Sequence, residues 1–146
     1  MKDEIYSKEK YVPSMKLSGV CDSLGVTGMN FGGGTCSVTC TVSTEHLNAG
    51  GVAHGGLHST MLDTALGGAL VSLIKKEEWC ATAQLDISFL NAANVGDVLV
   101  AEGKVLRRGR NLAHCEGILS NQDGVIIATA KGTWAIWASK PSSMNS

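Results

Sequence analysis

Residues Asn48–Asp63 read NAGGVAHGGLHSTMLD, a stretch that joins a glycine-rich turn to the start of the one long helix-compatible run in the chain. A helix that begins at Gly55 or Gly56 directs its unpaired N–H groups and the positive end of its dipole toward that turn. Such an end suits an anion or a developing oxyanion. The glycines also allow positive φ angles and a close approach to a ligand. The stretch therefore predicts a site at the helix start.

Asp63 lies two turns into this expected helix, within the apolar run Met61–Ile74. At helical spacing its stripe continues through Leu70 and Ile74, and a helix that is apolar on every side is normally buried. A buried acid is a candidate for chemistry. An Asp near a helix start more often interacts with the positive end of the helix dipole or caps the helix than takes part in catalysis. The functional interpretation therefore depends on Asp63 together with the glycine turn and Asn48.

The composition excludes several classes of protein. The length of 146 residues suits one domain with its own core, and the net charge of −1 gives no basic footprint for nucleic acid or an anionic membrane. No run reaches the roughly 18 to 20 apolar residues of a membrane span, and the mixed charges of the first residues do not form a secretory signal. Five scattered cysteines without a C-x-x-C pair favour reduced thiols in a cytoplasmic protein.

Alternation of polar and apolar residues predicts strands on both sides of the helix. The expected strands are Leu24–Phe31, Thr35–Ser43, Thr82–Leu90, Val98–Leu106, Leu112–Ser120 and Val125–Trp137. Asp123-Gly124 is the clearest hairpin signal, since Asp-Gly suits a tight turn with positive φ. Gly67 and Gly68 inside the helix each cost roughly 1 kcal/mol relative to alanine, which indicates close packing against a sheet or a partner helix.

This order of elements predicts an α+β fold, with a largely antiparallel sheet of about six strands packed on one long helix. Residues 1–23 are expected to form an N-terminal arm, 24–138 the domain and 139–146 a loose C-terminal tail. The free face and edges of such a sheet must be covered, and oligomerisation is the natural cover.

A family resemblance rests on Asn48, His54-Gly55-Gly56, Asp63 nine residues after the histidine, the stretch Thr82–Leu90 and a Gly96-Asp97 turn. Together these resemble the hotdog-fold acyl-CoA thioesterases, most closely the phenylacetyl-CoA thioesterase branch, over most of the chain. The resemblance implies a hotdog fold, homodimers that pair their sheets edge to edge, and commonly a dimer of dimers, which is a homotetramer. It also implies hydrolysis of an acyl-CoA thioester at a site shared by two subunits. Coenzyme A is then part of the substrate, and no separate cofactor is expected.

The resemblance also implies roles for the residues of the central stretch. The Gly55 N–H would polarise the thioester carbonyl, with Gly56 beside it as a substrate-binding residue. Asp63 of the partner chain would be the general base that activates water, or a nucleophile. Thioester hydrolysis needs a stabiliser for the oxyanion and a base for water, and no metal, so these roles fit the chemistry.

Asn48 and His54 would orient the carbonyl or the thiolate leaving group, and Thr82 would help to hold the attacking water. His54 and His58 are four residues apart, as zinc ligands can be. The glutamate of a His-Glu-x-x-His motif is absent, however, and no third ligand is evident, so no metal is expected.

The chain departs from the family at Asn91-Ala92, where a basic residue and a proline are usual, so a common phosphate contact is missing. The turn that holds Arg107, Arg108 and Arg110 could supply the charge instead, because arginine pairs well with phosphate. A solvated turn is the alternative for these arginines.

Two other functions stay open. The first is dehydration or hydration of an acyl chain on CoA or a carrier protein, for which His54 and Asp63 could form the required histidine–carboxylate pair. The second is a non-catalytic acyl-CoA binding module. Asp63 argues against the second, since binding alone does not call for a buried base.

Overall fold

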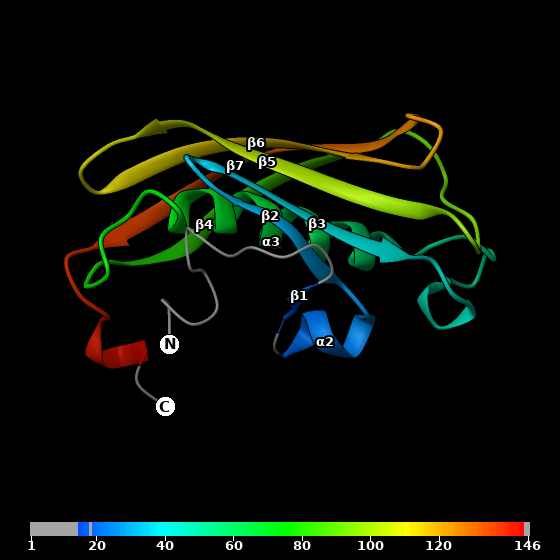
Figure 1. The fold of residues 1–146 in the computed structure, drawn as a ribbon, viewed down its shortest axis with the longest axis horizontal. Coiled ribbons are helices and arrows are strands. Elements are labelled where there is room, and N and C mark those ends of the chain that lie inside the picture. Colours follow the sequence, from blue (N-terminus) through cyan, green and yellow to red (C-terminus); the bar gives the residue numbers. More distant parts are fainter. Residues whose placement is uncertain (1–14, 18, 145–146) are drawn as a thin grey trace.

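The computed structural model describes residues 15–17 and 19–144, in which one antiparallel sheet curves around one long helix (Figure 1). The strand order is β1-β2-β3-β5-β6-β7-β4. The strands are β1 (Met15–Lys16), β2 (Thr27–Gly32), β3 (Thr35–Thr41), β4 (Trp79–Phe89), β5 (Val98–Arg108), β6 (Leu112–Ser120) and β7 (Ile126–Trp137), and the helices are α2 (Val20–Leu24), α3 (Gly55–Val71) and the short 3-10 turns η1 (Thr44–His46) and η2 (Ser142–Met144). The α+β fold is confirmed, with the two-residue β1 added to the six expected strands.

The N-terminal boundary differs from the expectation. The predicted strand Leu24–Phe31 begins only at Thr27, because Val20–Leu24 form α2 and Gly25 ends that helix in the left-handed conformation at φ 73°. The pattern gave no assignment for β1 or α2, and residues 1–14 of the expected arm lie outside the described residues. The division of the chain at residues 24 and 138 stays a prediction.

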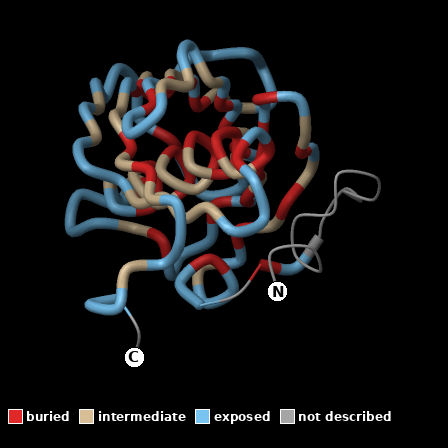
Figure 2. Tube along the Cα trace, turned by 90° about the vertical axis from the view of Figure 1, so that its left-hand side faces the viewer, coloured by how far each residue is buried: buried red, intermediate tan, exposed pale blue. Residues whose placement is uncertain are grey.

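Small residues let α3 lie directly on the sheet, and the buried residues concentrate around this helix (Figure 2). A Cβ at Gly103 would lie 2.6 Å from the Ala65 carbonyl, so helix backbone and strand backbone are in contact there. A Cβ at Gly68 would lie 2.6 Å from Cys36 Sγ, and one at Gly67 would lie 3.4 Å from Trp134 Nε1. The predicted packing of the helix glycines against a sheet is confirmed.

One edge of the sheet is open along a long strand. Within the described residues β4 pairs only with β7, over the register Trp79↔Trp137 to Phe89↔Ala128. Along residues 81–89 no other described strand pairs with its outer side, so another strand can pair there. Thr82 lies on this edge strand, with Asp63 beside it, and Gly55 lies beside Phe89 at the end of the strand.

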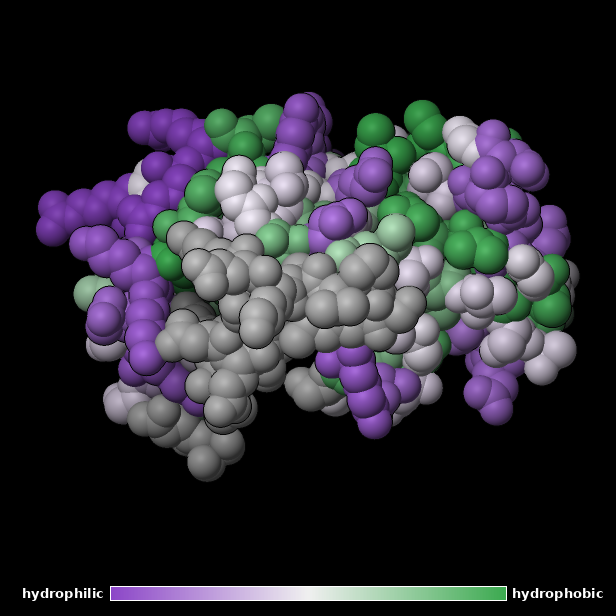
Figure 3. Space-filling model, in the orientation of Figure 1, coloured by the Kyte–Doolittle hydropathy of each residue, from purple (hydrophilic) through white to green (hydrophobic). Residues whose placement is uncertain are grey.

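No disulfide joins any two of the five cysteines, all of which lie within the described residues. Among the described residues, no helix is long and apolar enough to cross a membrane. On the face drawn in Figure 3, strongly hydrophilic side chains gather at the end formed by the β5–β6 turn and the α3–β4 loop. Arg107 and Arg108 are the last residues of β5 and only Arg110 lies in the turn, so the expectation that the turn holds all three arginines is wrong for the first two.

Candidate active site

The start of α3 leaves one amide available for a ligand. His54 is the N-cap residue, and its Nδ1 accepts a hydrogen bond of 2.7 Å from the Gly56 N–H. The Leu57 N–H donates to the His54 carbonyl at 2.9 Å. In the part of the chain that the structure describes, the Gly55 N–H has no acceptor. Of the two glycine amides proposed from the sequence, Gly55 is thus the free one, and Gly56 is used by His54.

The hydrogen bond from Gly56 also fixes the tautomer of His54. Because Nδ1 is the acceptor, the neutral ring carries its proton on Nε2. His54 is exposed, so this Nε2–H is available to donate to a ligand.

Side chains that lie close to the backbone explain why glycines occupy the helix start, and positive φ angles do not. A Cβ at Gly55 would lie 3.1 Å from Phe89 Cε1, and one at Gly56 would lie 2.8 Å from His54 Nδ1. Among the glycines of residues 50–56 only Gly51 has a positive φ, at 83°. The expectation that Gly55 and Gly56 supply positive φ angles is therefore wrong. The ring of Phe89 takes the space that a side chain at residue 55 would need.

Asn48 organises the loop before α3. Its Oδ1 accepts hydrogen bonds from the N–H groups of Gly50 at 2.8 Å and Val52 at 3.4 Å. Any contact of Asn48 with a substrate would therefore come through its Nδ2 hydrogens. Its predicted role in orienting the substrate stays a prediction.

Asp63 and Thr82 form the second half of the candidate site. Thr82 Oγ1 donates a hydrogen bond of 2.6 Å to Asp63 Oδ1. The register between β4 and β7 shifts between Thr82 and Gln84, and a bulge of this kind re-aims the side chain next to it. Asp63 is half-buried and not fully buried, because it lies beside the open edge strand.

A pocket of about 300 Å³ adjoins this pair. Its apolar walls include Trp134 from β7, Val71 from α3 and two residues near the N-terminus, Leu17 and Cys21. Trp134 is almost completely buried, with 2% of its surface exposed. The acid thus borders on a space that could accept a small apolar group.

The two halves of the site do not meet within one copy of the chain. Gly55 and Asp63 are eight residues apart on α3, which is about 12 Å at 1.5 Å per residue. Gly55 lies beside Phe89 at the end of β4, whereas Asp63 lies beside Thr82 near its start. Both halves nevertheless border the open edge of the sheet.

The three arginines differ in their contacts. Arg108 pairs with Glu78 and donates to the Gly109 carbonyl at 3.2 Å. The Lys75 N–H and then the Arg108 guanidinium hold the pKa of Glu78 below its ordinary value. Arg108 therefore ties the β5–β6 turn to the α3–β4 loop. Arg107 and Arg110 are exposed and remain the candidates for a phosphate contact.

His58 was not identified as a functional candidate from the sequence, except as a possible zinc ligand. Only 4% of its surface is exposed, and its Nδ1 has no hydrogen-bond partner among the described residues. Its ring lies against Phe89, with 6.2 Å between ring centroids. Burial, and then the charge of His54, lower the pKa of His58.

Cys40 and His46 lie outside the candidate site and serve the structure. Burial raises the pKa of Cys40, so its thiol is a poor nucleophile even though Sγ lies 3.9 Å from His46 Nε2. His46 instead donates to the Leu24 carbonyl at 2.6 Å and accepts from the Ser43 N–H at 2.9 Å. Across residues 15–17 and 19–144, no group of three or more His, Cys, Asp or Glu side chains could hold a metal ion.

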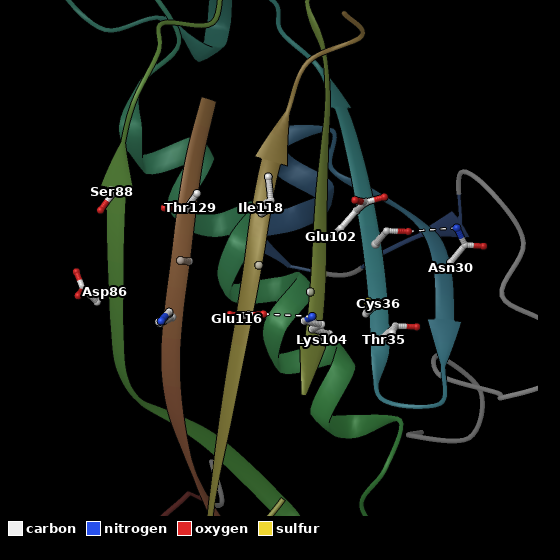
Figure 4. Close-up of a pocket in the computed structure, with 15 residues that line it drawn as sticks. Asn30, Thr35, Cys36, Asp86, Ser88, Glu102, Lys104, Glu116, Ile118 and Thr129 are labelled. Carbon is white, nitrogen blue, oxygen red and sulfur yellow. Dashed lines mark hydrogen bonds and ion pairs between the residues drawn. The ribbon is translucent and has the colours of Figure 1, made fainter. Parts of the chain in front are cut away.

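A hollow of about 970 Å³ lies on the sheet face opposite α3 and contains no predicted site residue (Figure 4). A row of charged residues crosses it, with Lys104 opposite Glu116, Glu116 opposite Lys131, and Lys131 opposite Asp86. Lys104 Nζ and Glu116 Oε1 are 3.2 Å apart. Opposite charges on neighbouring strands stabilise the sheet by roughly 0.2 to 1 kcal/mol per pair. We therefore assign this row to the stability of the sheet and place the candidate site at the β4 edge.

Comparisons with known proteins point to one family. A family model described as the thioesterase superfamily matches residues 50–128. Human acyl-coenzyme A thioesterase 13 is 32% identical over 95 residues, which cover 63% of this chain and 66% of that protein. A protein of Pseudomonas aeruginosa that is provisionally named an esterase is 32% identical over 97 residues, which cover 66% of this chain and 72% of the relative. A provisionally named esterase of Caenorhabditis elegans is 35% identical, and the match spans 59% of its length.

Solved structures agree with these sequence relatives. The PaaI protein of the phenylacetic acid degradation operon of Escherichia coli has a TM-score of 0.74 and 26% identity, with 79% of this chain and 81% of that chain covered. A hypothetical thioesterase of Streptococcus pneumoniae, solved with coenzyme A, has a TM-score of 0.72 and 28% identity, with 80% and 88% covered.

Proposed function

This chain belongs to the thioesterase superfamily, and we propose that it hydrolyses acyl-CoA thioesters to a free acid and coenzyme A. One observation carries the proposal: the hydrogen-bonded pair of Asp63 and Thr82 and the free amide of Gly55 lie along the same open sheet edge. A base for water and a donor for the oxyanion are the two groups that this hydrolysis needs.

We propose that two copies of the chain complete the site. When β4 pairs antiparallel with β4 of a second copy around a two-fold axis, the Phe89 end of one strand lies beside the Trp79 end of the other. The Gly55 amide of one copy then approaches Asp63 of the other. The open β4 edge and the 8-residue separation of Gly55 and Asp63 support this arrangement. A dimer of dimers, as the family resemblance implies, stays a prediction that mass measurement in solution would check.

The roles follow from the hydrogen bonds of each group. Asp63 accepts a proton from water while the water oxygen bonds to the thioester carbon, and Thr82 holds the carboxylate in place. The carbonyl oxygen gains charge against the Gly55 N–H. The C–S bond then breaks, and the thiolate takes a proton, with the His54 Nε2–H placed to stabilise it. Direct attack by Asp63 on the carbonyl carbon is the other route that the same geometry allows.

Two features support acyl-CoA as the substrate. Human acyl-coenzyme A thioesterase 13 is named for this substrate, and the Streptococcus pneumoniae neighbour was solved with coenzyme A. In this chain the sheet row of Thr82 runs through Trp134 and Ala113 to Arg108. The exposed Arg107 and Arg110 lie one residue before Arg108 and two residues after it. We propose them as the phosphate contacts.

The test is thiol release from a panel of acyl-CoAs, with Asp63→Asn as the informative variant. Asp86→Asn is the matched control, because Asp86 lies on β4 but points to the opposite face of the sheet. Release that is lost in Asp63→Asn and kept in Asp86→Asn supports the proposal. Consumption of an enoyl or hydroxyacyl substrate without thiol release would instead indicate a dehydratase, and tight binding without turnover a binding module.

A mixing experiment tests the shared site. Asp63→Asn removes the base. Gly55→Val places a side chain against Phe89, beside the Gly55 N–H that the substrate carbonyl must approach. Each variant alone is expected to be inactive. After the two are mixed and allowed to exchange subunits, one site in each mixed dimer has both halves intact, so about a quarter of the wild-type activity should return. No recovery despite demonstrated exchange would place the whole site within one copy.

A further inference from the structure

We infer that Leu17 and α2, here called the N-terminal wall, close the acyl pocket and set the size of the acyl group that the enzyme accepts. This inference rests on the proposed thioesterase function. It assigns a role to a part of the chain that lies outside residues 50–128, which the family model matches.

The N-terminal wall is held in place by contacts on both sides. Leu17 and Cys21 are buried, and Cys21 Sγ lies 3.3 Å from Thr64 Oγ1 of α3. The Val26 N–H donates to the Cys21 carbonyl at 2.8 Å, which fixes α2 to the chain that enters β2. Figure 1 shows α2 on the side of α3 that faces away from the body of the sheet. The wall therefore covers the face of α3 that the curved sheet leaves open.

The chemistry of the thioester indicates which group enters the pocket behind this wall. Three atoms surround the carbon that water attacks: the carbonyl oxygen, the sulfur and the first carbon of the acyl group. The oxygen must face the Gly55 amide, and the sulfur leads to the large, charged coenzyme, which must reach solvent. The acyl group is the remaining substituent. The pocket beside Asp63, walled by Trp134, Val71, Leu17 and Cys21, is an apolar space of the right kind for it.

The size of the pocket limits the acyl group. Its volume of about 300 Å³ lies at the lower end of the roughly 300 to 1,000 Å³ that ligand pockets span. We therefore expect the pocket to accept a short or medium acyl chain, or one aromatic ring with its linker, in preference to a long-chain fatty acyl group.

Gly67 offers a variant that narrows the pocket without harming the fold. It lines the pocket, and an added Cβ would make an ordinary contact of 3.4 Å with Trp134 Nε1. Alanine also stabilises a helix relative to glycine. Gly67→Ala is thus expected to raise the melting temperature and to reduce the space for the acyl group. Gly68→Ala is the contrasting neighbour, since its Cβ would lie 2.6 Å from Cys36 Sγ and should lower the melting temperature.

The wall itself is tested with Cys21→Phe, which directs a ring toward the pocket. Ser23→Phe places the same ring on the exposed side of α2 and is the matched control. The measurement is kcat/KM for acetyl-, butyryl-, hexanoyl- and octanoyl-CoA. One methylene in an apolar pocket changes discrimination about 10- to 200-fold. We expect Gly67→Ala and Cys21→Phe to lower the ratio of octanoyl to acetyl activity at least about tenfold, and Ser23→Phe to leave it unchanged.

Binding provides a readout that does not depend on hydrolysis. Thioether analogues of the same acyl-CoAs cannot be cleaved, and calorimetry gives their dissociation constants. The octanoyl analogue should bind Gly67→Ala more weakly than wild type, with the acetyl analogue unaffected. An unchanged ratio in both folded variants, in turnover and in binding, would overturn the inference. Selective weakening of the octanoyl analogue without thiol release from any acyl-CoA would support the pocket and refute the hydrolysis.

Discussion

Thr82 Oγ1 donates a 2.6 Å hydrogen bond to Asp63 Oδ1, which links the edge strand β4 to the third turn of α3. The bulge between Thr82 and Gln84 gives Thr82 this direction. The hydroxyl therefore holds the carboxylate in one orientation, and its oxygen lone pairs remain able to accept a hydrogen bond from water.

Thr82→Val keeps the shape of the side chain and removes the hydroxyl. A hydrogen bond to a charged group contributes about 1.5 to 3 kcal/mol, so we expect kcat to fall roughly ten- to hundredfold with little change in KM. Thr82→Ser should retain most of the activity. The control is Thr129→Val on β7, which points to the opposite face of the sheet. If Thr82→Val and Thr82→Ser were equally active, the hydroxyl would have no part in the reaction.

The contact between Gly103 and the Ala65 backbone predicts a large effect on stability. A Cβ at Gly103 would lie 2.6 Å from both the carbon and the oxygen of the Ala65 carbonyl, and helix backbone cannot rotate away as a side chain can. We expect Gly103→Ala to lower the free energy of unfolding by about 3 kcal/mol or more, at the upper end of the effect of overpacking. Urea denaturation followed by circular dichroism measures it.

Lys104→Ala is the control for this change. It alters the next residue of β5 and removes the exposed ion pair with Glu116, which should cost no more than about 1 kcal/mol. If Gly103→Ala were as stable as Lys104→Ala, the close approach of α3 to the sheet would be incorrect.

His58 predicts how stability depends on pH. Burial and then the charge of His54 lower its pKa from the ordinary value of 6.5, so below about pH 6.5 the unfolded chain binds a proton that the folded chain does not. The contribution of His58 is therefore constant at higher pH, and the free energy of unfolding falls as the pH drops below about 6.5. Urea titrations between about pH 5 and pH 8 measure this fall.

His58→Leu removes the titrating ring together with its unpartnered Nδ1, and its unfolding free energy should fall less steeply toward acid pH. His114→Leu, which changes an exposed histidine, should retain the wild-type slope. Equal slopes in wild type and His58→Leu would show that the proton binds elsewhere.

The sequence predicts most of the strands because their residues alternate, and it predicts the start of α3 because glycines precede an apolar run. It did not predict α2, since Val20–Leu24 is too short for a periodic pattern. The half-burial of Asp63 depends on the position of β4 at the sheet edge, a property of strand order that local patterns do not contain. The commitment of the Gly56 amide to His54 likewise depends on the rotamer of one ring.

The reactivity of the thiols provides a last prediction, which concerns Cys80. This cysteine is half-buried and lines the pocket beside Asp63, whereas the other four are buried. Burial and then the neighbouring Cys80 raise the pKa of Cys115 to about 12, and burial raises the pKa of Cys40. Because the thiolate is the reactive form, iodoacetamide should modify Cys80 first, which peptide mass spectrometry can show.

The uncleavable thioether analogue of butyryl-CoA should slow this labelling, since an acyl group in the pocket lies against Cys80. Free coenzyme A, which lacks the acyl group, is the control and should protect less. Cys80→Ser should remove the fast phase of labelling. Equal protection by coenzyme A and by the analogue would mean that the acyl group lies outside this pocket. Rapid labelling of Cys115 would contradict the burial of this residue on β6.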